Sequence, residues 1–297
     1  MQNNDFIEFK RERDLGMMIT DAFKFLRQEW KPFFKTIIKI SLAPILLAIA
    51  SIIFFSFSFS DFFSNIMSTN SFGGYEESTS NFGLLFLAIA AYLLFYLIAY
   101  VMVTASAMYY VKSYIDNQGK IDFEYVKRMT LLKFWSFAGL YFVSGIIVGV
   151  GALFCGLPGV YFGVVLSISA CILVFFEKGA MEAISDAFNF IKGHWWETFG
   201  ILIVIFLIVG VLNYITQVPA TIYQLIQMGT SSFGSGDPTA VFDIFKDPFY
   251  LGLLVLSEGF KFLIGTITLL VTIFIFFDIN EQKNNTGAID KIDTIGS

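Results

Sequence analysis

The chain has 297 residues, of which 56% are hydrophobic, 18% aromatic and only 14% charged, with a mean hydropathy of +0.72. A soluble domain carries roughly a quarter charged residues, so this composition excludes an ordinary soluble protein and predicts an integral membrane protein with the lipid bilayer as a partner. The 19 Lys and Arg against 24 Asp and Glu argue against a nucleic-acid partner, because phosphate recognition needs a concentrated basic surface.

Six apolar runs are long enough to cross about 30 Å of hydrocarbon, which needs roughly 20 helical residues. They span residues 37–57, 82–111, 134–154, 157–176, 199–215 and 249–277. A short turn that contains Gly156, Pro158 and Gly159 separates the third run from the fourth, which predicts a tight hairpin. The expected fold class is all-α, a polytopic membrane protein with six transmembrane helices.

Lys and Arg residues sort to one side of these runs. They lie before the first run, between the second and third, between the fourth and fifth, and after the sixth, whereas the opposite connections carry only Lys246. By the positive-inside rule, both termini are predicted to be cytoplasmic, in the inner membrane of a bacterium. The outside loops, around 68–80 and 229–237, are rich in Ser and Gly and are predicted to be flexible.

These assignments predict five segments in chain order. They are a cytoplasmic N-terminal segment with an interfacial helix (1–33), spans one to four (34–176), a second interfacial helix (177–198), spans five and six with an outside loop (199–277) and a cytoplasmic tail (278–297).

An internal repeat carries the two interfacial helices. Residues 19–34, ITDAFKFLRQEWKPFF, recur 165 positions later as ISDAFNFIKGHWWETF, with seven of sixteen positions identical. The positions singled out are Asp21, Phe23, Phe25 and Trp30 in the first copy, and Asp186, Phe188, Phe190 and Trp195 in the second. Apolar residues at helical spacing, with acids early and bases late, predict an amphipathic helix at the membrane interface. Four spans separate the copies, so the repeat is predicted to be parallel.

A second reading of the repeat stays open. Each copy could instead be a cytoplasmic extension of the span that follows it. Pro32 favours a break between helix and span in the first copy, because a proline inside a helix removes a hydrogen-bond donor.

The pattern DAF-F, followed by a basic residue and a Trp and leading into a span, resembles the six-helix membrane domain of the glycerophosphoryl diester phosphodiesterase membrane-domain superfamily. The stretches YYVKSYIDNQGKIDFEYV and FFDINEQKNNTGAIDKIDTIG look like a Bacteroidota branch of it that has no catalytic domain. In the phosphodiesterases that name the superfamily, a separate soluble barrel is catalytic, and nothing in this chain could encode that barrel. The resemblance implies a membrane module with other membrane proteins, and a MoxR-type ATPase system, as partners.

Catalytic and metal-binding patterns are absent from the sequence. His194 is the single histidine, so a histidine-rich metal centre and a Ser-His triad are excluded, and a catalytic zinc site would lack ligands. We therefore expect no catalytic residue, metal or cofactor. The expected function is a non-catalytic membrane scaffold or assembly subunit, and the alternative is a transporter or lipid-handling module that uses the bundle interior.

Two further features are candidates for a role within the membrane. Glu258 and Lys261 lie three residues apart in the sixth run, so a helix makes them neighbours. A charge deep in lipid costs on the order of 3 kcal/mol, which makes the pair a functional candidate unless it anchors the helix at the outer interface, as we expect. Gly145 and Gly149 form a GxxxG that predicts either packing within the bundle, the expected reading, or homodimerisation.

Overall fold

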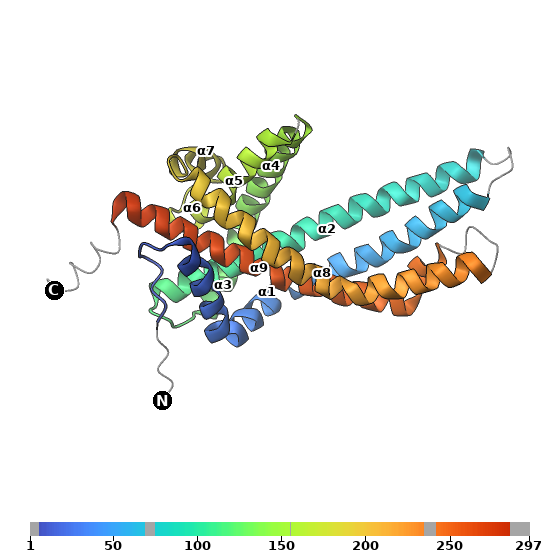
Figure 1. Ribbon diagram of the computed structural model, residues 1–297, viewed down its shortest axis with the longest axis horizontal. Coiled ribbons are helices and arrows are strands. Elements are labelled where there is room, and N and C mark those ends of the chain that lie inside the picture. The colour runs from blue at the N-terminus through green and yellow to red at the C-terminus, as the bar shows by residue number, and fades with distance from the viewer. Residues whose placement is uncertain (1–5, 69–74, 155, 235–241, 286–297) are drawn as a thin grey trace. The chain divides into compact units, whose positions relative to one another are not determined.

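The computed structural model describes residues 6–68, 75–154, 156–234 and 242–285 (Figure 1). The helices in chain order are α1 (Leu15–Ser68), α2 (Tyr75–Asp116), α3 (Phe123–Leu132), α4 (Phe134–Leu153), α5 (Leu157–Ser167), α6 (Ser169–Phe175), α7 (Ala180–Phe190), α8 (Trp195–Gly234), the 3-10 helix η2 (Asp243–Lys246) and α9 (Pro248–Asn284). No strand occurs among these residues.

Six helical stretches are long and apolar enough to cross a membrane. They span residues 15–67, 82–116, 134–153, 157–175, 195–229 and 248–284, and their apolar surfaces suit contact with a lipid bilayer. The expectation of an all-α polytopic membrane protein is therefore confirmed. Several helices run well beyond the apolar stretches that identified them, because helical hydrogen bonding continues into the polar flanks.

Residues 69–74 and 235–237 of the predicted outside loops lie outside the described residues, as do Cys155 and the end of the tail. Where these loops are described, at residues 75–80 and 229–234, the chain is helical rather than irregular. Those positions are the ends of α2 and α8.

The chain forms two compact units. Unit 1 comprises residues 1–41, 101–209 and 265–297, and unit 2 comprises residues 42–100 and 210–264. Unit 1 thus holds α3 to α7 together with parts of the four long helices, and unit 2 holds the remaining parts of those helices.

The predicted hairpin is present in unit 1 as α4 and α5. Gly156 precedes α5 with a φ of +77°, a conformation that glycine adopts without a Cβ penalty. The fourth apolar run is divided near Ile168 into α5 and α6. In Figure 1, α4 to α7 form one group of short helices.

The two copies of the repeat start helices at matching positions but then differ. α1 begins at Leu15 and α7 at Ala180, again 165 residues apart. The expected break at Pro32 is wrong, because α1 continues through it, with Phe25 and Phe33 fully buried on either side of the proline. The first copy is therefore an extension of the span that follows it. The second copy is divided between two helices, because α7 ends at Phe190 and α8 begins at Trp195.

The core of unit 1 is aromatic and includes the segment that precedes α1. Phe9 is buried, and its ring stacks on Phe274 of α9 at a centroid distance of 4.6 Å. Phe25 meets the ring of Tyr114 edge to face at 5.1 Å. Phe9 also meets Phe25 and Tyr114 edge to face, at 5.7 and 6.1 Å. These ring contacts, each worth about 0.5–1.5 kcal/mol beyond burial, hold the N-terminal segment against α1, α2 and α9.

Candidate functional site

In both copies of the repeat, the aspartate pairs with a basic residue eight positions earlier. Asp21 accepts a hydrogen bond from Arg13 Nε at 2.9 Å and a second from Arg11 at 2.6 Å. Asp186 lies 3.7 Å from Lys178 Nζ. Arg13 and Lys178 are themselves 165 residues apart, so the repeat begins earlier than sequence identity indicates. The two residues share a positive charge but not their identity, so a comparison of charge along the sequence could have found this earlier start of the repeat.

Arg13 is the centre of a polar network in unit 1. Its buried guanidinium donates to the Phe9 carbonyl at 2.8 Å and lies 4.7 Å from the centre of the Phe274 ring. Burial lowers the pKa of Arg13, whereas its hydrogen bond to Asp21 opposes that shift, and an arginine stays charged. The backbone N–H of Arg13 donates to Asp278 of α9 at 2.6 Å. The network therefore joins the N-terminal segment to α1 and α9.

The same end of α9 also binds the second copy of the repeat. Lys283 Nζ donates to the Phe190 carbonyl at 2.7 Å, where the last carbonyls of α7 lack helical partners. The Phe190 ring stacks on Phe276 at 5.1 Å. Asp278 thus bonds to Arg13, just before α1, and Lys283 bonds to the end of α7.

The aromatic residues of the first copy do not share one surface. Phe25 is fully buried in unit 1, whereas Phe23 and Trp30 are 38% and 54% exposed. Met18 and Ala22, two apolar residues at helical spacing on α1, are also buried against protein. The inner face of this part of α1 is therefore a protein contact, and Phe23 and Trp30 point outward.

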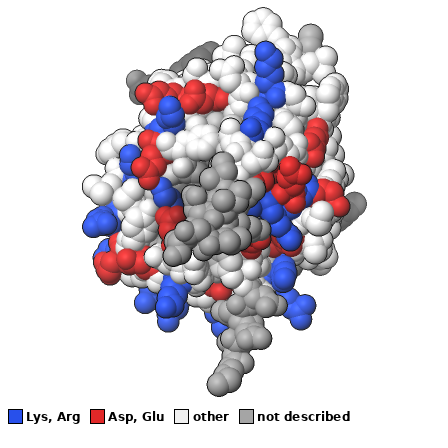
Figure 2. Space-filling view, turned by 90° about the vertical axis from the view of Figure 1, so that its left-hand side faces the viewer, with Lys and Arg blue, Asp and Glu red and all other residues white. Residues whose placement is uncertain are grey.

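Charges of both signs cover the nearby surface. Figure 2 shows acidic and basic side chains interspersed over one face of the molecule. Among the pairs of unit 1, Lys112 donates to Glu177 at 2.6 Å and to the Val174 carbonyl at 3.1 Å. The hydrogen bond and charge of Lys112 hold the pKa of Glu177 below its usual range.

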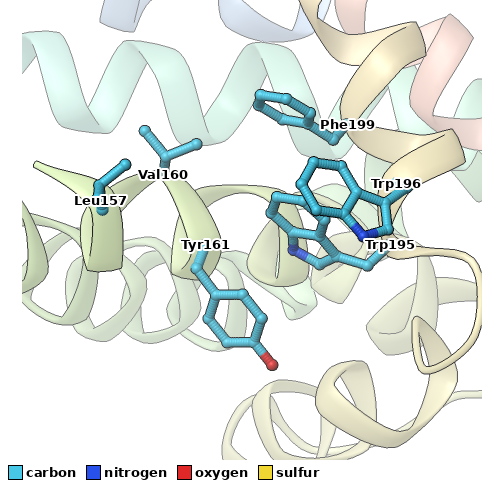
Figure 3. Close-up of a pocket in the computed structure, with 6 residues that line it drawn as sticks. All are labelled: Leu157, Val160, Tyr161, Trp195, Trp196 and Phe199. Atoms are coloured by element: carbon cyan, nitrogen blue, oxygen red, sulfur yellow. The ribbon is translucent and has the colours of Figure 1, made fainter.

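An aromatic groove of about 540 Å³ lies between α5 and the start of α8 (Figure 3). Its lining residues are Leu157, Val160, Tyr161, Trp195, Trp196 and Phe199. The Trp195 ring stacks on Phe199 at 5.0 Å and on Tyr161 at 5.8 Å. Its volume lies within the roughly 300–1,000 Å³ of small-molecule sites, and its lining is apolar. The sequence did not predict this groove, because its walls come from α5 and from the start of α8, which are separated along the chain.

Glu258 and Lys261 form an ion pair in unit 2. Lys261 Nζ lies 2.5 Å from Glu258 Oε1, and Glu258 is only 8% exposed. Glu258 is buried within unit 2, because Phe262, one turn further along α9, packs against Tyr96 at 5.2 Å and places this face of the helix against protein. The location of the pair at the outer membrane interface stays a prediction.

The GxxxG of α4 does not pack against another helix in the described structure. A methyl group added at Gly145 or Gly149 would meet no atom within 4 Å, so the expected packing within the bundle is wrong for this pair. The close contact lies further along the hairpin. A methyl group on Gly159 would lie 2.7 Å from the backbone nitrogen of Ala152, and one on Gly151 would lie 2.9 Å from that of Gly159. The glycines that bring α4 and α5 together are therefore these two.

The sequence matches no known family model, and comparisons with curated proteins and with solved structures also found no match. The site residues are therefore interpreted from their own geometry. Among the residues that the structure describes, no group of His, Cys, Asp and Glu side chains could hold a metal ion. His194 Nδ1 lies 3.7 Å from Glu197, and Cys171 is a buried free thiol.

Proposed function

We propose that this chain is a non-catalytic scaffold or assembly subunit of a larger complex in the inner membrane of a bacterium, with both termini in the cytoplasm. The observation that carries the proposal is the double contact made by α9. Asp278 bonds to Arg13, just before α1, and Lys283 bonds to the end of α7. These charged groups hold the two copies in one body, which suits a rigid binding surface.

The outward aromatic side chains of the first copy are the proposed contact with a partner. Phe23 and Trp30 lie beside exposed charged residues of α1, Lys24 and Arg27. Aromatic and arginine side chains are enriched where proteins bind one another. The resemblance to the phosphodiesterase membrane-domain superfamily supports other membrane proteins, with a MoxR-type ATPase system, as the partners.

Co-purification from native membranes tests this function. The unmodified protein, extracted in mild detergent, is expected to retain a fixed set of partner proteins, and Phe23→Ser with Trp30→Ser to lose them. Trp135→Ser is the matched control, because Trp135 is an exposed tryptophan outside the repeat, on α4. Retention of the partners by the repeat variant, or equal loss by the control, would refute the proposed contact surface.

A lipid-handling module is the second candidate function, and the aromatic groove favours it. A groove lined by apolar side chains at the start of a long apolar helix suits an acyl chain. A path for a polar headgroup needs charged side chains, and in unit 2 the buried Glu258–Lys261 pair could provide them. This function predicts that the pure protein, without partners, moves a fluorescent lipid between the leaflets of liposomes. It also predicts that Glu258→Gln with Lys261→Met abolishes this movement.

A further inference from the structure

The α4–α5 hairpin packs closely against α7 and the start of α8. Phe162 of α5 meets Phe188 of α7 at a ring distance of 6.1 Å, and Tyr161 stacks on Trp195 at 5.8 Å. α7 also contacts α4 and α6. All of these elements belong to unit 1, so the hairpin and α7 have a defined relation.

α7 lies at a boundary with water. It is preceded by Lys178, carries Glu182 and Asp186, and is followed by Lys192 before α8 begins. The side chains of Lys178 and Asp186 are 45% and 44% exposed. Exposed charges are costly in hydrocarbon, so this helix belongs at the headgroup level rather than inside the membrane.

The turn of the hairpin is too close to α7 to reach the opposite side of the membrane. Phe162 lies six residues after Gly156, which is about 9 Å along a helix. The Phe162 and Phe188 rings are 6.1 Å apart, and each side chain extends roughly 4 Å from its backbone. Added to the roughly 9 Å along the helix, these lengths place the turn at most about 23 Å from the α7 backbone. Hydrocarbon is about 30 Å thick, so a crossing hairpin would need more length than these contacts leave.

The surface of the turn also suits hydrocarbon rather than water. Leu153 and Leu157, on either side of the turn, are 84% and 78% exposed, and Phe154 is exposed beside them. The sequence has no charged residue from position 134 to position 176. A loop that emerged into water would leave these apolar side chains hydrated, whereas lipid chains would cover them.

We propose that the α4–α5 hairpin enters the bilayer from the side on which α7 lies and turns back within the adjacent leaflet. Its partners are the acyl chains of that leaflet, which contact Leu153, Leu157 and the aromatic groove. Four helices then cross the membrane. Because the hairpin supplies two helices, the termini stay on one side whether or not it crosses, so the charge pattern in the loops could not distinguish these topologies.

Two measurements on one variant test the proposal. Leu157→Cys is made in a chain that lacks Cys155 and keeps the buried Cys171, with Met67→Cys, at the far end of α1, as the matched control. In intact cells, an impermeant maleimide should label Met67→Cys and leave Leu157→Cys at least tenfold less labelled. In proteoliposomes, bimane on Leu157→Cys should be quenched more strongly by nitroxides on acyl chains than by nitroxides on headgroups.

The proposal requires both results. Labelling of Leu157→Cys from outside at the rate of the control would show that the hairpin crosses. Stronger quenching by headgroup nitroxides would place the turn at a membrane surface and overturn the proposal equally. Both variants replace exposed side chains, and the bimane measurement is made on purified protein, so a failure to fold is seen directly as lost solubility.

Discussion

Separating the Glu258–Lys261 pair should be far more damaging than removing it. Glu258 is 8% exposed, and Lys261, one turn along α9, is its ion-pair partner at 2.5 Å. Lys261→Met alone leaves a buried carboxylate without that partner, and Glu258→Gln alone leaves the ammonium without its own. The double variant carries neither charge and keeps side chains of similar size.

The magnitude follows from burial. Removing one member of a buried ion pair costs about 3–5 kcal/mol, whereas replacing both members is often neutral or stabilising. We therefore expect each single change to lower the free energy of unfolding by about 3 kcal/mol and the double change to alter it by less than about 1 kcal/mol. The coupling energy between the two positions should then be several kcal/mol, which is large for a contacting pair.

The exposed pair Asp61–Lys246 provides a matched control in the same unit. Its side chains are 55% and 36% exposed, and such pairs contribute at most about 1 kcal/mol. Unfolding of the unmodified protein and the three variants of the buried pair in bicelles, compared with Asp61→Asn, Lys246→Met and their double variant, measures both couplings under identical conditions. If the single changes at Glu258 and Lys261 were as mild as those of the control, Glu258 would be hydrated and our interpretation of its burial would be wrong.

Three further predictions concern unit 1. Gly159→Ala should destabilise the protein by about 1–3 kcal/mol in thermal unfolding, because its methyl group would overlap the α4 backbone, whereas Gly149→Ala should be neutral. The low pKa of Glu177 predicts that its contribution to stability is present above about pH 4.3, the ordinary value for glutamate, and is lost as the pH falls further. Because Glu177 is largely exposed, its replacement by Gln should remove less than about 1 kcal/mol at neutral pH. Asp278→Ala should weaken the attachment of the N-terminal segment to α9 by about 1.5–3 kcal/mol. Hydrogen exchange of the backbone amides of residues 9–13 should then be at least tenfold faster.

The apolar runs predicted the membrane helices well, because length and hydropathy are properties of the local sequence. The partners of individual residues could not be predicted in this way. The GxxxG and Gly151 lie on the same helix, α4, and only the position of α5 decides that Gly151 makes the close contact. Likewise, the spacing of Glu258 and Lys261 predicted their pairing, whereas the burial of Glu258 depends on how Phe262 meets α2.

The repeat shows how one pattern acquires two structures. In the first copy, Glu29 accepts a hydrogen bond from Tyr110 at 2.8 Å, and the helix continues into the first apolar run. The position before it, Gln28, corresponds to Gly193 in the second copy, where φ is +91°. That conformation is unfavourable for residues other than glycine and ends the helix. The break separates α7 from α8, and α7 packs against α4, α5 and α6. The glycine therefore lets the second copy divide into α7 and the start of α8, whereas the first copy continues into its span.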